Sequence, residues 1–326
     1  MSFYDAVAST TGTAITVAKG TVVASTGISI LLSALLYFKQ SSLIYPRYLP
    51  EGARTEVPTP DEVNIQDWER VKLFTKDGET LNSYFIKARR PAGVTVLFMH
   101  GNAGNIGHRL QIAKIFAESM GCNFFMLSYR GYGLSTGRPS EKGLIIDAQT
   151  ALDYLLDNPE AKDTKIFAYG QSLGGALAIQ LTVKNQGKIS GLVLENTFRS
   201  MRTLIPSAFP PAKYLARLCH QIWPSETTLP LIEHTPTLFL SGLRDEIVPP
   251  SHMATLHNVC VSPKMWIEFP LGSHNDTHAE TGYFDAILDF VKKVVRGEPI
   301  ASEKHQANSS NRSSSDSRKD SAISDL

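Results

Sequence analysis

The chain has 326 residues, of which 32 are basic and 31 acidic, so its net charge is +1. Hydrophobic residues make up 42% and charged residues 19%, a composition that excludes a disordered chain and is typical of a globular protein with an ample core. The balanced charge, without a basic stripe interleaved with aromatic residues, argues against a nucleic-acid partner. The three cysteines are widely spaced, which excludes a disulfide framework or a metal-ligand cluster and predicts buried thiols: Cys122, Cys219 and Cys260.

A short N-terminal segment, residues 1–19, precedes an uncharged run over residues 20–38. The run has 19 residues, and an α-helix that crosses a bilayer needs about 20. A cleaved signal peptide is the alternative, but its apolar core spans only about 7–15 residues and a small-residue cleavage site is missing here. We therefore predict one uncleaved transmembrane anchor at residues 20–38.

The side of the membrane on which the body lies stays open. Lys39, Arg47 and Arg54 follow the anchor closely, and this positive charge favours a cytosolic body. Glycosylation sequons at Asn275, Asn308 and Asn311 would matter only in a lumenal compartment.

Residues 39–68 are rich in proline and charge and are interpreted as a linker. The body is predicted at residues 69–298 and begins with a β-hairpin around the turn KDGE. Six short apolar runs then alternate with longer stretches of helical spacing: 94–100, 123–129, 165–170, 191–196, 237–242 and 264–269. This alternation predicts an α/β fold with a mostly parallel sheet covered by helices on both faces. The serine-rich tail, residues 299–326, is predicted to be disordered because it has few large apolar groups.

The stretch GQSLG, residues 170–174, follows one apolar run and precedes a helical one. A G-x-S-x-G sequence in that setting is typical of a nucleophile elbow, the sharp strand-to-helix turn that exposes a catalytic serine. The alternative is that the glycines serve only a tight turn. The elbow interpretation requires that Ser172 be followed along the chain by an acid and then by a histidine.

An acid and a histidine follow in that order, each just after a predicted strand: Asp245 after residues 237–242 and His274 after residues 264–269. We predict that Ser172, Asp245 and His274 form a catalytic triad. Other acids and histidines are weaker candidates: the neighbouring Glu246, the second-choice acid Glu195, His252 and His257 in a helix-like stretch, and His278, which a capping box from Thr277 to Glu280 would place in the last helix.

The tetrahedral intermediate of acyl transfer needs two backbone donors. We expect them to be the amides of Leu173 and Asn102, the latter in the loop HGNAGN that follows the first buried strand. That loop lacks the G-K-[ST] ending of a phosphate-binding loop, and the glycines at 131, 133 and 137 miss the dinucleotide-binding spacing by one residue. The sequence therefore predicts neither a cofactor nor a bound metal.

Residues 197–233 contain no strand-like run and are predicted to form a small helical cap over the serine. Its apolar side chains would suit an acyl chain or would fasten the cap to the body, and both readings stay open. The side chains that we expect at the substrate are Tyr132, Phe198, Phe209 and Trp223.

Five stretches together resemble the α/β-hydrolase-domain-containing membrane proteins, in the branch of the fungal Bem-type and plant wavy-growth proteins: HGNAGNIGHR, SYRGYGLSTGRPSE, GQSLGG, ENTFRSM and GSHNDT. The resemblance covers roughly residues 35–298. It implies an α/β-hydrolase fold whose nucleophile, acid and histidine match Ser172, Asp245 and His274. Family members are single-pass membrane proteins, often of the endomembrane system, so the endoplasmic reticulum, another endomembrane or the plasma membrane is the expected location.

Relatives in the wider group remove fatty acyl groups from proteins or lipids. The resemblance and the residues together predict a serine hydrolase of acyl esters or thioesters, with a lipid or an S-acylated protein as substrate, as in a palmitoyl-protein hydrolase. The alternative is a scaffold for growth polarity in which the hydrolase fold only binds partners. A serine peptidase ranks last, since the chain lacks a large gating domain.

Overall fold

The computed structural model describes residues 26–27, 31, 33–34, 37–208, 213–214, 216–300 and 304–306. Residues 1–19, much of the predicted anchor, Phe209 and most of the predicted tail lie outside the described residues. Within the described residues, no helix combines the length and the apolar character that crossing a bilayer requires.

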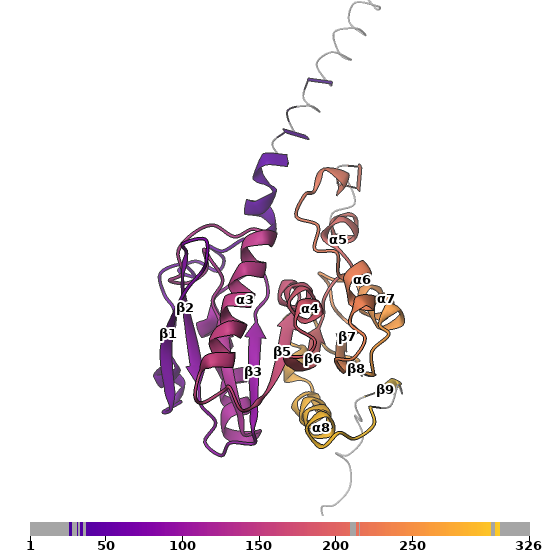
Figure 1. Ribbon diagram of the computed structural model, residues 1–326. Helices are drawn as coiled ribbons and strands as arrows, with labels where there is room; N and C mark the ends of the chain where they lie inside the picture. Colours follow the sequence, from indigo (N-terminus) through magenta and orange to yellow (C-terminus); the bar gives the residue numbers. More distant parts are fainter. Residues whose placement is uncertain are drawn as a thin grey trace, which may run out of the picture.

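A single sheet of nine strands forms the centre of the molecule, in the order β1-β2-β4-β3-β5-β6-β7-β8-β9 (Figure 1). The strands are β1 Trp68–Phe74, β2 Thr80–Ile86, β3 Val94–Met99, β4 Cys122–Leu127, β5 Lys165–Gln171, β6 Ile189–Glu195, β7 Thr237–Gly242, β8 Lys264–Phe269 and β9 Lys304–Gln306. The hairpin β1–β2 is antiparallel and β2 runs antiparallel to β4, whereas all other neighbours are parallel. The predicted hairpin and mostly parallel sheet are thus confirmed.

Helices cover both faces of this sheet, because its central strands are apolar on both sides. Every residue of β3, β4 and β7 is buried. One core packs α3 (Glu141–Asp157), α4 (Leu173–Lys184) and α7 (Ser251–Val259) on one face. The other core packs α2 (Leu110–Lys114), the π-helical turn η3 (Ile115–Ser119) and α8 (Tyr283–Arg296) on the opposite face. Side chains alternate between the cores, as with Leu97 in the first and Phe98 in the second.

The remaining elements are short helices. They are η1 Pro60–Val63, η2 Ile106–Arg109, α5 Met201–Ala208, η5 Ala216–Leu218, α6 Ser225–Thr228, η6 Leu229–Leu231 and η7 Thr277–Ala279. Four of them, α5, η5, α6 and η6, fall within residues 197–233, and the described residues of that segment contain no strand. The three cysteines are buried and free, as predicted.

Two segments differ from the sequence interpretation. Residues 39–68 are not a free linker: Tyr45, Ala53 and Ile65 are buried, and Asn105 Nδ2 donates to the carbonyls of Ala53 (3.0 Å) and Glu56 (2.9 Å). A composition rich in proline and charge does not reveal that a few apolar residues anchor the segment. Within the predicted tail, β9 adds to the sheet edge beside β8.

Candidate active site

Ser172 lies at the turn between β5 and α4, with φ 52° and ψ −115°. This left-handed backbone is costly for a residue with a side chain, and such strain is characteristic of functional turns. The glycines around it are required by close approach. A Cβ on Gly170 would lie 2.1 Å from the carbonyl oxygen of Gly174, and one on Gly174 would lie 1.9 Å from the carbonyl oxygen of Met99. The motif therefore forms the tight elbow that its spacing predicts.

The structure brings the three predicted triad residues together from the ends of three strands. His274 Nε2 lies 3.0 Å from Ser172 Oγ, and His274 Nδ1 lies 2.8 Å from Asp245 Oδ2. Asp245 follows β7 and His274 follows β8. All three side chains are buried. The arrangement is that of a serine made nucleophilic by an imidazole whose orientation a carboxylate fixes.

The carboxylate of Asp245 is fixed through both of its oxygens. Oδ2 faces the imidazole, while Oδ1 accepts from the amides of Ile247 (2.9 Å) and Val248 (2.7 Å). Because an ionised carboxylate can only accept, His274 Nδ1 carries the proton and Nε2 presents its lone pair to Ser172. The adjacent Glu246 accepts instead from the backbone amide of His274 (3.2 Å). The two neighbouring acids thus hold the same histidine by its ring and by its backbone.

The tripeptide Glu195-Asn196-Thr197, at the end of β6, connects the loops that carry the triad. The Ser172 amide donates to the carbonyl of Glu195 (2.8 Å), and Thr197 Oγ1 donates to the carbonyl of Ser172 (2.7 Å). Asn196 stands in the left-handed region, at φ 45°. These bonds hold the serine turn from both sides, although β6 itself supplies no triad residue.

Asn196 extends the same connection to the other two loops. Its Oδ1 accepts from the amide of Gly242 at the end of β7 (2.8 Å). Its Nδ2 donates to the carbonyl of Ser273 (3.1 Å) and to Thr277 Oγ1 (2.9 Å), on either side of His274. Sequence reasoning missed this residue. The available signal was an asparagine directly after an apolar strand, where its tolerance of left-handed backbone is useful.

The side chain of Glu195, the second-choice acid, forms its hydrogen bonds with Tyr169, Tyr283 and Gln171, and not with the His274 ring. Its Oε2 accepts from the hydroxyls of Tyr169 (2.6 Å) and Tyr283 (2.8 Å), which lie 2.5 Å from each other. Burial raises the pKa of both tyrosines well above 10. Both phenols therefore stay protonated and satisfy the buried carboxylate, and this network joins β5, β6 and α8 beneath the elbow.

The loop after β3 lies against the elbow and holds the second expected oxyanion donor. A Cβ on Gly101 would lie 3.9 Å from Ser172 Cβ. The carbonyl of Asn102 accepts from the Tyr132 hydroxyl (2.7 Å), and Asn102 Nδ2 donates to the carbonyl of Ile44 (3.1 Å). Leu173 begins α4, so its amide has no acceptor within the helix, and the Asn102 amide donates to no backbone carbonyl in the described part of the chain. Both amides can serve a developing oxyanion.

The His100 side chain packs against this loop inside the protein. It is fully buried, its Nδ1 lies 2.7 Å from the carbonyl oxygen of Gly101, and its ring stacks on Tyr129 with centroids 4.2 Å apart. Burial lowers the pKa of His100 to about 3, because the charged imidazolium would lose its hydration. The ring is therefore neutral at physiological pH and acts as a packing residue.

The predicted substrate contacts need correction. Tyr132, Phe198 and Trp223 are completely or almost completely buried, and offer no surface to a substrate in this structure. Tyr132 holds the carbonyl of Asn102, and Trp223 Nε1 donates to the Tyr45 hydroxyl (3.1 Å). Large aromatic residues in a cap can face a pocket or the body, and the sequence does not distinguish the two. Phe209, the fourth of these residues, lies outside the described part of the chain.

The histidine ring that bonds the side chains of Ser172 and Asp245 belongs to none of the remaining candidates, His278, His252 and His257. The capping box expected at Thr277 is wrong: α8 begins at Tyr283, and Thr277 Oγ1 donates to the carbonyl of Ser273 (2.6 Å), which places His278 in η7. His252 and His257 are buried in α7. Among the described residues, no group of histidine, cysteine, aspartate and glutamate side chains is arranged to hold a metal ion.

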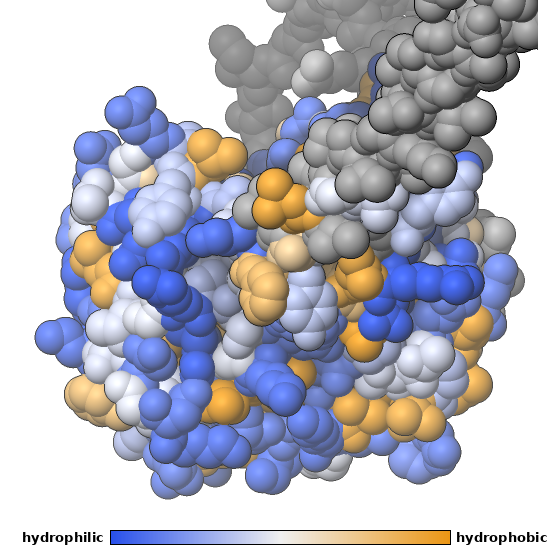
Figure 2. Space-filling view, turned by 90° about the horizontal axis from the view of Figure 1, so that it is seen from above, coloured by the Kyte–Doolittle hydropathy of each residue, from blue (hydrophilic) through white to orange (hydrophobic). Residues whose placement is uncertain are grey.

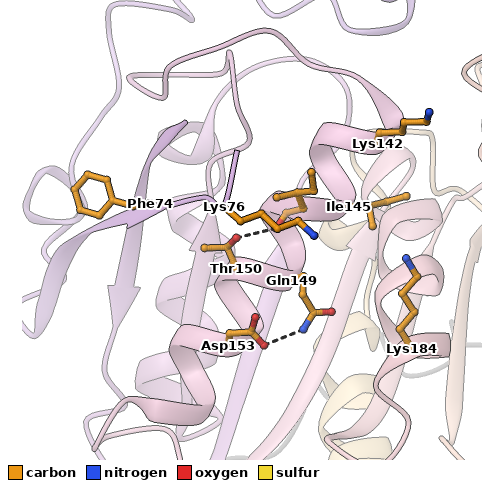
Figure 3. A pocket seen from close by; sticks show the side chains of 9 residues that line it. Phe74, Lys76, Lys142, Ile145, Gln149, Thr150, Asp153 and Lys184 are labelled. Atoms are coloured by element: carbon orange, nitrogen blue, oxygen red, sulfur yellow. Dashed lines mark hydrogen bonds between the residues drawn. The ribbon is translucent and has the colours of Figure 1, made fainter. Parts of the chain in front are cut away.

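An open surface groove of about 810 Å³ lies elsewhere, along α3 (Figure 3). Its lining includes Phe74 and three lysines, Lys76, Lys142 and Lys184. Ser172, Asp245 and His274 do not line this groove, and it contains no nucleophile paired with a base. It is therefore not the candidate active site.

Comparison with known sequences agrees with this geometry. Protein bem46 of Schizosaccharomyces pombe is 48% identical over 279 residues, which cover 84% of this chain and 93% of that protein. This chain belongs to the Bem46 family of α/β-hydrolase-domain-containing proteins. Family relatives include the membrane protein YNL320W of Saccharomyces cerevisiae (46% over 274 residues, 83% and 94% covered) and WAV2 of Arabidopsis thaliana (39% over 287 residues, 82% and 92% covered). The predicted family is thus confirmed.

Broader comparisons place the Bem46-family fold among the hydrolases. The model of the serine aminopeptidase family S33 matches residues 90–232, a range that includes Ser172. An α/β-hydrolase of Vibrio vulnificus superposes with a TM-score of 0.64 at 22% identity, covering 77% of this chain and 91% of that one. An esterase of Pyrococcus furiosus superposes with a TM-score of 0.59 at 16% identity, covering 75% and 99%. The chain has the α/β-hydrolase fold.

Proposed function

We propose that this protein is a membrane-anchored serine hydrolase that cleaves acyl esters or thioesters, with a lipid or an S-acylated protein as substrate. The observation that carries the proposal is the continuous hydrogen-bonded line from Ser172 Oγ through the His274 ring to Asp245, with contacts of 3.0 and 2.8 Å. If the glycines served only a tight turn, the serine would not require an imidazole and a carboxylate from the ends of two other strands.

In the acylation step, Ser172 Oγ attacks the carbonyl carbon while its proton passes to His274 Nε2. Negative charge moves to the carbonyl oxygen, where the amides of Asn102 and Leu173 donate to it. Collapse of this intermediate breaks the bond to the alcohol or thiol, which leaves with the proton from His274. Asp245 stabilises the imidazolium throughout and stays ionised.

The acyl-enzyme is then hydrolysed by the reverse sequence of roles. Water gives a proton to His274 and its oxygen attacks the acyl carbon, forming a second intermediate at the same two amides. Its collapse returns the proton to Ser172 Oγ and releases the carboxylic acid. Each cycle consumes one water and leaves the protein unchanged, so no cofactor is needed.

An apolar acyl group is supported by the side chains around the site. Leu243 and Ile247 lie two residues before and after the buried Asp245, and their side chains are 39% and 42% exposed. Membrane anchoring is supported by the uncharged residues 20–38 and by the description of one close relative as a membrane protein. An endomembrane such as the endoplasmic reticulum is the proposed location.

A fluorophosphonate probe, which reacts covalently with activated serines, tests the proposal on the full-length protein in membranes. We expect labelling of the wild type, none of Ser172→Ala, and undiminished labelling of Ser207→Ala, a matched control in which the exposed serine of α5 is removed. Equal labelling of wild type and Ser172→Ala would refute catalysis by this serine. The scaffold alternative is tested by complementation, because a scaffold would keep its function in Ser172→Ala.

Substrate class is tested with nitrophenyl esters of increasing acyl length and with S-acylated peptides. We expect turnover to rise with acyl length. A preference for acetyl over long-chain esters would contradict the lipidic substrate, while leaving the serine mechanism intact.

A further inference from the structure

The chain between the N-terminal helix and the body is bonded directly to the loop that carries the proposed oxyanion donor. The last described turns of the helix span residues 37–44. The carbonyl of Ile44 accepts from Asn102 Nδ2 (3.1 Å), and the carbonyl of Leu49 accepts from the amide of Gly104 (2.7 Å). The helix is therefore attached at the site itself, not tethered by a flexible connection.

The same segment is bonded to the cap. Gln40 Oε1 accepts from the amide of His220 (2.8 Å), and its Nε2 faces the carbonyl of Leu218 (3.4 Å). The Tyr45 hydroxyl donates to Gln221 Oε1 (2.9 Å) and accepts from Trp223 Nε1. The N-terminal helix, the cap and the loop of Asn102 thus form one connected unit. In Figure 1 the helix and α5 both lie at the upper end of the domain.

The outer side of this unit exposes large apolar and aromatic side chains. Phe38 is 78% exposed, Leu43 64%, Leu49 60% and Tyr214 79%. We define the rim surface as Phe38, Leu43, Tyr48, Leu49, Tyr214 and Leu218, all of which are exposed. Figure 2 views the molecule from above and shows apolar residues interrupting the polar surface of this face. Such side chains are costly to leave in water, and their occurrence on segments that are bonded to one another indicates a binding surface.

Basic residues predominate in the two stretches of chain that form the rim surface, and the nearest acid after Leu49 is the exposed Glu51. Residues 37–49 contain Lys39 and Arg47 and no acid, and residues 213–223 contain Lys213, Arg217 and His220 and no acid. The Arg47 guanidinium lies 4.9 Å from the Tyr48 ring centre, and Lys213 Nζ lies 4.8 Å from that of Tyr214. Cations paired with exposed aromatic rings suit the boundary between anionic headgroups and acyl chains.

We propose that the rim surface rests on an anionic lipid bilayer and holds the loop of Asn102 close to it. This inference rests on the proposed function and deepens it, because a substrate acyl group would then reach Ser172 from the membrane without crossing water. The length of the helix between Phe38 and Leu43 is consistent with this placement. From Phe38 to Leu43 the helix rises about 8 Å, on the order of the thickness of one headgroup layer. If residues 20–38 cross the bilayer, the rim surface lies at its boundary.

Depth-dependent fluorescence tests the contact without requiring any activity. The full-length protein is placed in vesicles of phosphatidylcholine with phosphatidylserine. A nitrobenzoxadiazole dye is attached at Leu49→Cys or, as matched control, at Val261→Cys, a 62% exposed apolar position between α7 and β8. The native thiols are buried. We expect nitroxide-labelled lipids to quench the dye at position 49 several-fold more than at position 261, and more with phosphatidylserine than without it.

Equal quenching at positions 49 and 261 would overturn the proposal. It would do so even in an active enzyme, and strong quenching at position 49 would support it even in an inactive one. The outcomes for this inference and for the proposed function are therefore distinguishable. Quenching that is independent of phosphatidylserine would overturn the part of the proposal that assigns a role to the basic residues.

A kinetic measurement tests the consequence for substrate access. The double variant Leu43→Asp, Leu49→Asp places two acids on the rim surface but keeps the backbone carbonyls that bond the loop, and Val261→Asp is its control. We expect the double variant to lose about tenfold in hydrolysis of a long-chain ester embedded in anionic vesicles, and to keep its rate on a short soluble ester. An unchanged rate on vesicles, or an equal loss on both substrates, would contradict the proposal.

Discussion

Asn196 is the residue whose removal most directly tests the interpretation of the site. It lies outside the proposed triad, yet it joins the end of β7 to the loop of His274. Replacement by alanine removes the acceptor for the Gly242 amide and the donors to Ser273 and Thr277. The alanine must also adopt the φ of 45° that Asn196 has.

The expected loss of stability follows from these contacts. The buried amide of Gly242 loses its acceptor, at a cost of about 1–3 kcal/mol. The carbonyl of Ser273 keeps its second bond, from Thr277 Oγ1 (2.6 Å), so it adds little. Left-handed backbone costs alanine about 1 kcal/mol more than asparagine. We expect a total of about 2–4 kcal/mol, of which Asn196→Gly should recover about 1 kcal/mol because glycine accepts this conformation freely.

The expected loss of activity is larger than the loss of stability implies. A displacement of His274 by about 1 Å would reduce the rate about a hundredfold, because proton transfer depends on near-contact geometry. The assay compares kcat/KM and urea unfolding of full-length variants in detergent micelles. The control is Asn123→Ala, since Asn123 is likewise buried and bridges Ala88 (2.9 Å) and Glu160 (3.0 Å) away from the site. It should lose stability but keep kcat/KM.

Asn196 does not position the triad if Asn196→Ala, corrected for its folded fraction, hydrolyses ester as fast as Asn123→Ala. In that case the loops of His274 and Asp245 would be held by other contacts, and the bonds of Asn196 would stabilise the fold alone.

Three further outcomes follow from the same contacts. Gly174→Ala places a Cβ 1.9 Å from the carbonyl oxygen of Met99, where only backbone can yield, so we expect a loss above about 3 kcal/mol, measured as a fall in Tm. Burial lowers the pKa of His100 to about 3 in the folded protein, whereas the pKa is about 6.5 in the unfolded chain. Between about pH 3 and pH 6.5 the unfolded chain therefore binds more protons than the folded one. The contribution of neutral His100 to the free energy of unfolding is complete above about pH 6.5 and falls by about 2 kcal/mol by pH 5. Urea unfolding at both pH values, with a flatter profile in His100→Asn, checks this. Asp245→Asn should lower kcat by about 10⁴ and Glu246→Gln by less than tenfold, because of these two acids only Asp245 bonds the imidazole. Similar losses of kcat in the two variants, measured as initial rates, would contradict these roles.

Much of the architecture can be predicted from the sequence because it depends on residues that are close together along the chain. Continuous apolar runs predict strands buried on both faces, and glycines at 170 and 174 predict a turn that no other residue fits. The order of Ser172, Asp245 and His274 along the chain, each after a strand, depends only on where strands end. In a parallel sheet those ends share one edge, so convergence follows from topology without any knowledge of side-chain packing.

Only the tertiary structure determined which side chains face inward and which segments meet. Tyr132 and Trp223 could have lined a pocket, yet they are buried as supports of the Asn102 loop and of Tyr45. Residues 39–68 have the composition of a linker, yet they pack on the site. No local pattern around Asn196 reveals the residues that its side chain bonds. Burial, and hydrogen bonds between distant segments, depend on how the whole chain packs. A local pattern of residues therefore does not reveal them.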